Sequence, residues 1–475
     1  MKQNSEISEL AQRADGEAGG VERSAETKPE KEASESPRLT GLMALVCERK
    51  NLNAAWRKVV KNKGSAGTDG MTVEELPTYL REHGAQLREQ LLADSYRPQP
   101  IRQVTIPKPD GGERVLGIPT VVDRFVQQAI LQVLQPIFDP TFSPYSFGFR
   151  PGRSAHDAIA CAKQFVQQGR AWVVDLDLSK FFDRVNHDIL MGRLAKRIED
   201  KPLLRLIRRY LVAGMLANGA VMAREEGTPQ GGPLSPLLAN VLLDEVDKEL
   251  AQRGHTFVRF ADDLNVYVGS KRAGERVMEA LKGKYAKLKL QINEEKSAVA
   301  PVGDRKFLGF TLRVHKGQAR TMIADKSVAK FKMKVRLLTS RNSGRSMSHI
   351  TQRLNLYLRG WYGYFGHADW QNTVQDLEKW TRRRLRLVQL KLWKHPRGTY
   401  KGLLRLGVDP RRAREVAAHA GRWWWLSGHH TNGALTNKYF DGLGLYCFTK
   451  QRQAAHSLNR PVRTRTPGGV AGDGR

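Results

Sequence analysis

The chain of 475 residues is 40% hydrophobic, which is ordinary for a globular protein and leaves room for roughly two to four packed domains. Its 79 Lys and Arg against 48 Asp and Glu give a net charge of +31, which favours a polyanionic partner over an anionic membrane or a merely soluble basic surface. Three distant cysteines exclude a disulfide framework and a paired-cysteine zinc cage, and without a ~20-residue apolar run or a signal-peptide pattern we expect a cytoplasmic protein.

The first part of the chain is predicted to be a polar leader followed by helices. Residues 1–37 are rich in Glu and have no aromatic side chain, which predicts a disordered leader. Apolar residues then recur three and four apart in "TGLMALVCERKNLNAAWRKVVKN" and again in "VEELPTYLREHGAQLREQLL", with a glycine-containing loop at 63–70 between them. We therefore expect a helical N-terminal extension over 38–97.

Strand and helix patterns alternate from about residue 98 to 315. The turn signal "PDGG" divides two β-rich runs within 100–120, and helical periodicity follows over 121–138. Ser154 can cap the next helix. Later strands are predicted in "AWVVDLDLS", "RFADDLNVYV" and "KFLGFTLRV", and helices in "PLLANVLLDEVDKEL" and "RAGERVMEALKGKYAKLKL". This order predicts an α+β domain with an antiparallel sheet.

Two pairs of carboxylates interrupt the apolar strands of this domain. Asp262 and Asp263 are adjacent, and by themselves they fit an ordinary turn. Because strand residues alternate faces, the two converge on one object only if the chain bends between them. Asp175 and Asp177 lie two apart in an apolar strand, where a buried carboxylate needs a partner or a metal ion. A strand-end Asp beside such a hairpin provides the oxygen ligands that a two-metal Mg²⁺ site requires.

Eight sequence blocks in a fixed order resemble the reverse transcriptases encoded within bacterial group II introns. They are "KGSAGTDG", "IPKPDGGERVLGIPT", "SFGFRPGRSAHDAI", "DLSKFFDRVNH", "GTPQGGPLSPLLANVLLDE", "RFADDLNVYV", "LQINEEKS" and "KFLGFTL". The region 357–394 is similar to the thumb and maturase region of this family, whereas nothing in the chain matches the HNH endonuclease that some members carry. The resemblance implies a right-hand polymerase, with fingers and palm over 38–315 around the antiparallel sheet.

The resemblance also implies the site residues. The catalytic carboxylates Asp177, Asp262 and Asp263 would hold two Mg²⁺ ions, whereas Asp175 matches no assigned role and is interpreted as a supporting group. Phe260 stands where the family usually has Tyr. The nucleotide-binding residues would be Lys108, Arg114, Phe182, Gln230 and Phe260.

Two further sites follow from the same resemblance. Lys296 would protonate the leaving pyrophosphate, although pairing with Glu294 or Glu295 is an alternative for a surface lysine. The segment Phe307, Leu308, Gly309 and Phe310 would grip the primer end, or pack as an edge strand. Simple alternatives also exist for the nucleotide-binding residues, namely a core aromatic for Phe182 and a solvated hairpin for Lys108 and Arg114.

The last third of the chain is basic and predicted to be helical. From Lys326 onward it has 30 Lys and Arg against 7 Asp and Glu. The resemblance implies an all-α thumb and maturase region over 316–395 and a small DNA- or RNA-binding module over 396–450, and composition predicts a basic disordered tail over 451–475. The residues expected to contact RNA phosphates are Arg382, Arg383, Arg384 and Arg386.

The resemblance implies an RNA-directed DNA polymerase that adds dNTPs to a primer 3′-hydroxyl. Its partners would be an intron RNA template, a DNA primer or target, and dNTPs, and it would also bind its intron RNA to promote splicing and retromobility. Two alternatives remain: a free-standing reverse transcriptase used in host repair or defence, and a non-catalytic RNA-splicing cofactor. The sequence leaves the oligomeric state open.

Overall fold

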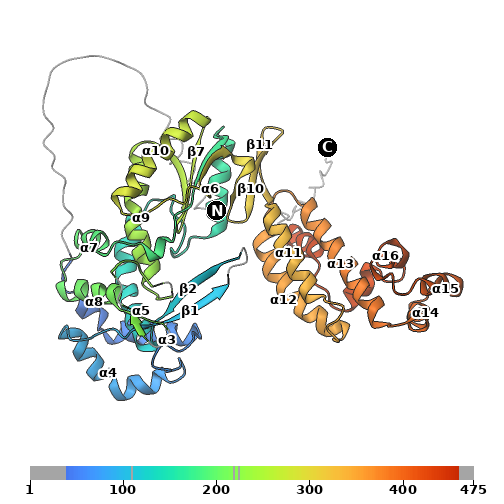
Figure 1. The fold of residues 1–475 in the computed structure, drawn as a ribbon, viewed down its shortest axis with the longest axis horizontal. Helices are drawn as coiled ribbons and strands as arrows, with labels where there is room; N and C mark the ends of the chain where they lie inside the picture. The colour runs from blue at the N-terminus through green and yellow to red at the C-terminus, as the bar shows by residue number, and fades with distance from the viewer. Residues whose placement is uncertain (1–38, 108–110, 218–219, 223–224, 230, 459–475) are drawn as a thin grey trace, which may run out of the picture.

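The computed structural model describes residues 39–107, 111–217, 220–222, 225–229 and 231–458, so the expected leader over 1–37 lies outside them. A larger part with three sheets precedes a helical part that begins at residue 325 (Figure 1). The fold is mixed α/β, with strands that pair antiparallel except for one parallel pair. Within the described residues, every helix is too short or too polar to cross a bilayer.

The N-terminal helices pack around one long central helix. The helices are α2 (Leu42–Val46), α3 (Arg49–Lys61), α4 (Leu76–Leu92) and α5 (Val121–Phe138). Helix α5 has the bounds that its apolar periodicity predicted, and the Thr120 side chain caps it by accepting from the backbone N–H of Asp123. All of its first ten residues are buried, because α2, α3 and α9 all contact this helix.

The first sheet has four strands, in the order β2-β1-β4-β5. The predicted hairpin consists of β1 (Ile101–Pro107) and β2 (Glu113–Ile118), paired from Arg102–Ile118 to Pro107–Glu113. Strands β4 (Met215–Ala217) and β5 (Ala220–Met222) were not predicted. Each has only three residues, which is too short for a period-2 pattern to stand out, and β4 joins the sheet through a parallel pair with β1.

The second sheet lies between helices, in the order β6-β7-β3-β8. Its strands are β3 (Trp172–Leu176), β6 (Thr256–Phe260), β7 (Asp263–Val268) and β8 (Ala298–Pro301). Helix α6 (Ala155–Gln167) contacts β6, and α10 (Lys271–Lys287) contacts β3 and β8. Figure 1 shows these two helices on opposite sides of the sheet. Ser154 begins α6 with a full capping box, as its sequence position predicted.

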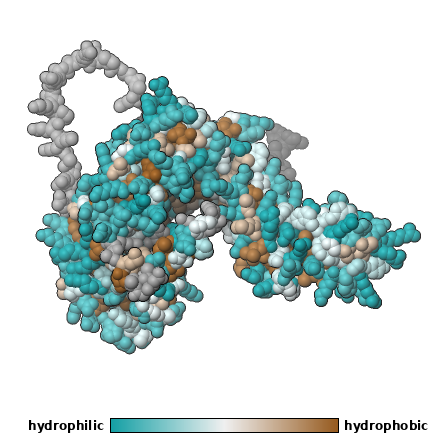
Figure 2. All heavy atoms as spheres, in the orientation of Figure 1, coloured by the Kyte–Doolittle hydropathy of each residue, from teal (hydrophilic) through white to brown (hydrophobic). Residues whose placement is uncertain are grey.

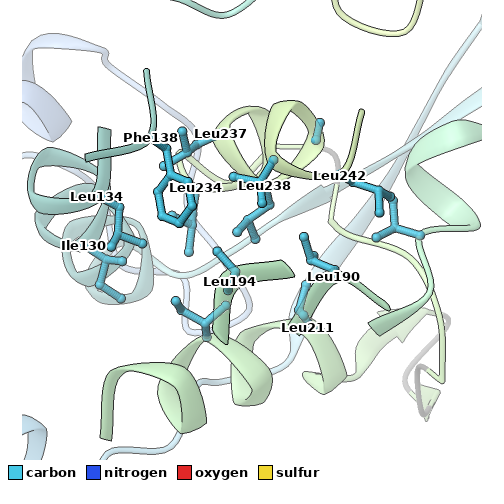
Figure 3. Packing of buried hydrophobic residues seen from close by; sticks show 14 of the residues in the cluster. Ile130, Leu134, Phe138, Leu190, Leu194, Leu211, Leu234, Leu237, Leu238 and Leu242 are labelled. Carbon is cyan, nitrogen blue, oxygen red and sulfur yellow. The ribbon is translucent and has the colours of Figure 1, made fainter. Parts of the chain in front are cut away.

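A large hydrophobic core joins this sheet to the N-terminal helices. Helices α7 (His187–Ala195), α8 (Lys201–Val212) and α9 (Ser235–Gln252) complete it. Figure 3 shows their leucines meeting those of α5; the labelled side chains are Ile130, Leu134, Phe138, Leu190, Leu194, Leu211, Leu234, Leu237, Leu238 and Leu242. The second sheet is therefore supported by closely packed helices.

The third sheet corrects one prediction. The segment "KFLGFTLRV" was expected to be one strand, but it forms β9 (Lys306–Phe307) and the start of β10 (Phe310–His315), with β11 (Gln318–Ile323) beyond. The chain reverses at Leu308 and Gly309, whose φ values are 49° and 84°. The left-handed conformation suits a two-residue hairpin. The β10–β11 hairpin also crosses residue 315, where a domain boundary was expected.

The helical part begins with α11 (Asp325–Leu338), α12 (Met347–Phe365) and α13 (Asn372–Leu392). Helices α14 (Pro396–Arg405), α15 (Pro410–Ala418), α16 (Trp423–Leu426), α17 (Asn437–Gly442) and α18 (Phe448–Leu458) follow. Helix α18 covers residues 451–458, which were expected to belong to a disordered tail, because buried Phe448 stacks on Tyr362 and no Gly or Pro interrupts the segment. The rest of that tail lies outside the described residues.

Candidate active site

The turn between β6 and β7 carries the paired carboxylates. Phe260 pairs with Asp263, so Ala261 and Asp262 form a two-residue turn. Ala261 has a φ of 60°, in the left-handed region that a residue with a Cβ seldom adopts. The chain therefore bends between Asp262 and Asp263, as the sequence predicted, and both carboxylates lie at one end of the sheet.

Asp177 reaches the same place from the neighbouring strand. Strands β3 and β7 pair up to Leu176 and Leu264, and Asp177 and Asp263 are the next residues on each side. The loop before β8 holds this strand end, because the Asp177 N–H donates to Ser297 Oγ at 3.0 Å and its carbonyl accepts from the Asn293 N–H at 2.8 Å. Three carboxylates that are up to 86 positions apart in sequence thus become neighbours.

The carboxylates strongly disfavour one another's charge. Desolvation, followed by the charges of Asp262, Asp177 and Asp175, raises the pKa of Asp263 to about 7. Desolvation, with the charge of Asp177 adding to it, also raises the pKa of Asp262, and the guanidinium of Arg114 opposes this shift. These carboxyl groups are costly to ionise when no cation is bound, and a cation between them would favour their ionised form.

The donor set suits a hard divalent cation, although the side chains are not drawn tightly together. In the described parts of the chain, no three His, Cys, Asp or Glu side chains are close enough to hold an ion between them. The oxygen donors and the mutual repulsion nevertheless fit Mg²⁺, which keeps water and substrate phosphates among its ligands. Asp177, Asp262 and Asp263 are the residues that would hold it.

The raised pKa of Asp263 predicts the pH dependence of stability. Because ionised Asp263 is disfavoured in the folded protein, its contribution to the free energy of unfolding depends on pH. That contribution is fully present below the ordinary pKa of 3.8 and is lost as the pH rises through about 7. The Asp263 side chain is exposed, so solvent screens much of this effect, and Asp263→Asn should raise the Tm of metal-free protein only slightly at pH 8 and leave it unchanged near pH 4, as measured by thermal unfolding in a chelator. Asp188→Asn is a control for which the change in Tm at pH 8 should have the opposite sign, because the hydrogen bond and charge of Arg208 lower the pKa of Asp188. Equal Tm values for wild type and Asp263→Asn at both pH values would contradict the prediction.

Asp175 has a structural partner. Arg305 Nε donates to its carboxylate at 2.7 Å, and the two side chains form an ion pair. The neighbouring Lys296 has its Nζ 3.7 Å from Asp177 Oδ2, while Glu294 pairs with Lys282. Lys296 thus pairs with a carboxylate of the site, and Glu294, one of its two alternative partners, pairs with Lys282 instead.

The expected nucleotide-binding residues are only partly described. Lys108 and Gln230 lie outside the described residues. Arg114 is exposed on β2, and its charge reaches Asp262. Phe182 is half-buried, with its ring 6.5 Å from that of Phe149. Phe260 is half-buried as well. It packs against a second hydrophobic cluster, which joins side chains of α6, β7 and β10 to those of α11, α12 and α13.

The loop around "GTPQGG" approaches these residues through its backbone. The Thr228 N–H donates to the Phe182 carbonyl at 2.6 Å. Gly231 has a φ of 145°, and a Cβ there would lie 2.3 Å from the Gly117 carbonyl oxygen at the end of β2. Glycine is therefore required for the loop to lie between Phe182 and the first hairpin.

The segment expected to grip the primer is a turn held by the helical part. Phe307 and Phe310 are buried in the second hydrophobic cluster. Tyr364 Oη donates to the Leu308 carbonyl at 2.8 Å, and Ser327 Oγ donates to the Gly309 carbonyl at 3.0 Å. Of these four residues, the aromatic pair packs in the core, and the turn is what remains near the surface.

The four arginines expected to contact RNA phosphates are mostly engaged with other groups of the protein. Arg382 is buried and paired with Glu378 at 2.6 Å, and Arg386 is buried with its Nε donating to the Leu435 carbonyl. Arg384 bonds to Thr339. Arg383 stacks over Trp424 at 4.1 Å. These side chains form an interface between α13 and its neighbours, because the apolar and cationic residues of this helix are interleaved rather than segregated.

One buried residue near the turn was not predicted. Arg259 is 0% exposed and donates to the carbonyl of Ala261 at 2.8 Å. The sequence feature that could have predicted it is a lone arginine inside the apolar strand "TFVRF", because a buried charge needs partners.

Comparison with known proteins identifies the class. Residues 106–312 match the family model "Reverse transcriptase (RNA-dependent DNA polymerase)", and residues 328–407 match "Group II intron, maturase-specific domain". Protein YkfC of Escherichia coli (strain K12) is 35% identical over 310 residues, which cover 57% of this chain and 81% of that protein. The group II intron-encoded protein LtrA of Lactococcus lactis subsp. cremoris is 37% identical over 206 residues, or 43% of this chain and 34% of LtrA. The chain therefore belongs to the group II intron-encoded reverse transcriptases, RNA-directed DNA polymerases that also carry a maturase domain.

A solved structure adds a weaker likeness. A chain of a partial Cas6–RT–Cas1–Cas2 complex is 25% identical, with 52% of this chain and 42% of that chain covered and a TM-score of 0.34.

Proposed function

We propose that this protein extends a DNA primer on an intron RNA template at the site formed by Asp177, Asp262 and Asp263. The convergence of these carboxylates from two paired strands carries the proposal. When bound there, two Mg²⁺ ions would activate the primer 3′-hydroxyl and neutralise charge on the leaving pyrophosphate. Lys296, whose Nζ lies 3.7 Å from Asp177 Oδ2, would give a proton to that pyrophosphate.

The surrounding elements would select and orient the nucleotide. Lys108 and Arg114 would hold the triphosphate, with Arg114 also balancing the charge of Asp262. The Phe182 ring would lie under the incoming sugar and clash with a 2′-hydroxyl. Phe260 would pack against the primer end without the hydroxyl of the usual Tyr, and Gln230 would contact the nucleotide.

The test of this proposal is dNTP incorporation on poly(rA)/oligo(dT). Incorporation should require Mg²⁺, disappear with a chelator and return when Mg²⁺ is restored. An unprimed template should give none. Wild-type protein that binds the primer–template but incorporates no dTMP would favour the alternative of a splicing cofactor without polymerase activity.

The parts of the chain would correspond to the domains of a right-hand polymerase. Residues 38–315 would form fingers and palm, with 38–97 as the N-terminal extension, residues 316–395 the thumb and maturase region, and 396–450 a small nucleic-acid-binding module. Figure 2 shows apolar residues over α11 and α12, among other apolar residues on the same face, and Met333, Leu337 and Leu356 are exposed on these helices. Retromobility and a bacterial cytoplasmic location are part of the same proposal.

The maturase role is expected to use a cavity beside α13. This cavity of about 500 Å³ is lined by Lys379, Arg383, Arg386 and His429 among others. Five basic side chains, Arg382 among them, and one acidic side chain, Asp376, line this hollow, and the excess of cations suits a phosphate of the RNA backbone. The cavity is therefore the RNA contact that we propose for α13.

Neutralising two cations of this cavity should weaken RNA binding. For Lys379→Ala combined with Arg383→Ala, we expect intron RNA affinity to fall about tenfold near 0.1 M salt and the slope of log K against log[salt] to decrease by about 1–2. Filter binding over a salt series measures both. Arg272→Ala with Arg276→Ala on α10 removes the same charge far from α13 (Figure 1) and should change neither quantity. Equal effects of the two double variants would contradict a local contact.

A further inference from the structure

Arg259 lies directly beneath the catalytic turn and is enclosed on every side. It and Asp247 on α9 are both 0% exposed, and the guanidinium Nε and Nη2 donate to the Asp247 carboxylate at 2.8 and 2.6 Å. A buried charge pair of this kind is costly to desolvate and gives little net stability by itself. Its retention in the core therefore needs another explanation.

The remaining donors of Arg259 connect three separate segments. Nη1 donates to the Ala261 carbonyl at 2.8 Å and to Asn240 Oδ1 at 2.9 Å. Nη2 donates to Ser146 Oγ at 2.8 Å. One planar group thus links the β6–β7 turn, helix α9 and the loop before α6.

Backbone bonds make the same connection more rigid. The Arg259 N–H donates to the Tyr145 carbonyl, and the Arg259 carbonyl accepts from the Phe147 N–H, each at 2.9 Å. Asn240 Nδ2 also donates to the Gly148 carbonyl at 2.9 Å. The loop is therefore fixed on both sides of the guanidinium contact.

The turn that this network supports is strained. Ala261 holds its left-handed φ of 60° with a methyl group present, a conformation that persists only where surrounding contacts stabilise it. Its carbonyl is the acceptor that Arg259 binds, and Asp262 is the next residue. Releasing that carbonyl allows the peptide between them to rotate, which moves the Asp262 side chain.

We propose that Arg259 is a positioning residue, which holds the Ala261 carbonyl so that Asp262 and Asp263 point to the same place. It contacts no substrate and acts through the turn. The proposal rests on the proposed polymerase site, and its test compares variants of a protein whose wild-type activity is measured separately. Failure of the wild-type assay would count against the proposed function, whereas failure of the variant pattern would count against the role of Arg259 alone.

Arg259→Lys is the informative substitution. A lysine retains the charge for Asp247, but one ammonium group cannot reach Asp247, Asn240, Ser146 and the Ala261 carbonyl together. We expect kcat for dTMP incorporation to fall about 10–100-fold with the KM for dTTP changed less than about threefold, because a small misplacement of reacting groups costs up to about 10² in rate. In nucleic-acid-free, metal-free protein, the amides of residues 260–264 should exchange hydrogen faster.

Arg150→Lys is the matched control. Arg150 is also a buried arginine of the 143–150 loop, paired with Asp139 at 2.9 Å and donating to backbone carbonyls, yet it has no hydrogen bond to the turn. It should lower the Tm comparably while leaving kcat within about threefold and exchange at 260–264 unchanged. The same kcat for both variants, or unchanged exchange in Arg259→Lys, would overturn the proposal.

A second variant covers the case in which Arg259→Lys does not fold. Asn240→Ala keeps the Arg259–Asp247 pair and removes only the side chain that shares Nη1 with the turn and binds Gly148. It should accelerate exchange at 260–264 and lower kcat about 3–10-fold. If both quantities match wild type, the network that joins Arg259, Asn240 and the Gly148 loop does not hold the turn, and the proposal is overturned.

Discussion

Asp262→Asn should abolish almost all primer extension, with kcat for dTMP incorporation reduced at least about a thousandfold. Asparagine has nearly the same shape as aspartate, so the two-residue turn should persist. The loss comes from the missing negative charge, which weakens metal binding at the point where Asp177 and Asp263 converge. Single-turnover incorporation on poly(rA)/oligo(dT) over a range of Mg²⁺ concentrations measures the effect.

Asp175→Asn is the matched control for this substitution. It removes the same charge from β3, the strand that Asp177 follows, but Asp175 is bound to Arg305. We expect less than a tenfold loss of kcat and a modest loss of Tm, since the partly exposed ion pair is weakened. If Asp262→Asn retained a tenth of wild-type activity, or if the two variants behaved alike, Asp262 would not belong to the catalytic set.

Gly148→Ala should be nearly as damaging, although no ligand role is assigned to this glycine. A Cβ at Gly148 would lie 2.1 Å from the Ala261 nitrogen and 2.8 Å from the Phe260 carbonyl carbon. Both are backbone atoms of the catalytic turn, which cannot move aside as a flexible side chain would. We expect the turn to be displaced, kcat to fall about 100-fold and the free energy of unfolding to drop by about 1–3 kcal/mol or more.

Gly283→Ala gives the control for Gly148→Ala. Gly283 lies within α10, and a Cβ there meets nothing within 4 Å. Because alanine is the better helix former, stability should rise by about 0.5–1 kcal/mol with activity unchanged. Thermal unfolding and incorporation assays separate the two cases. Wild-type activity in Gly148→Ala would show that the loop is free to yield.

Local patterns were sufficient to predict most of the elements around the site. The apolar periodicity of α5, the turn residues of the first hairpin and the cap at Ser154 all express preferences of neighbouring residues. The adjacency of Asp177 to Asp263 was predicted only with help from the family resemblance, because pairing between β3 and β7 joins residues that are remote in sequence.

The remaining features depend on tertiary contacts that no local pattern encodes. Strands β4 and β5 are too short to show a period, and Leu308 adopts a turn conformation that its side chain does not favour. Arg382 and Arg386 resemble surface cations in sequence, yet Glu378 and the Leu435 carbonyl bind them in the interior. Arg259 is another charge whose partners, Asp247 and Ser146, are brought to it only by the complete fold.

The second hydrophobic cluster makes the polymerase and maturase portions a single cooperative body. It contains Phe165 of α6 and Tyr267 of β7, and it continues without a break through Leu358 and Leu385 to Phe448. A protease cut between β11 and α11 would leave each fragment with a bare apolar face, so the fragments should stay associated or aggregate rather than separate. Selection on splicing and selection on DNA synthesis therefore act on the same packed side chains, and a mutation in this cluster that impairs one activity should impair the other.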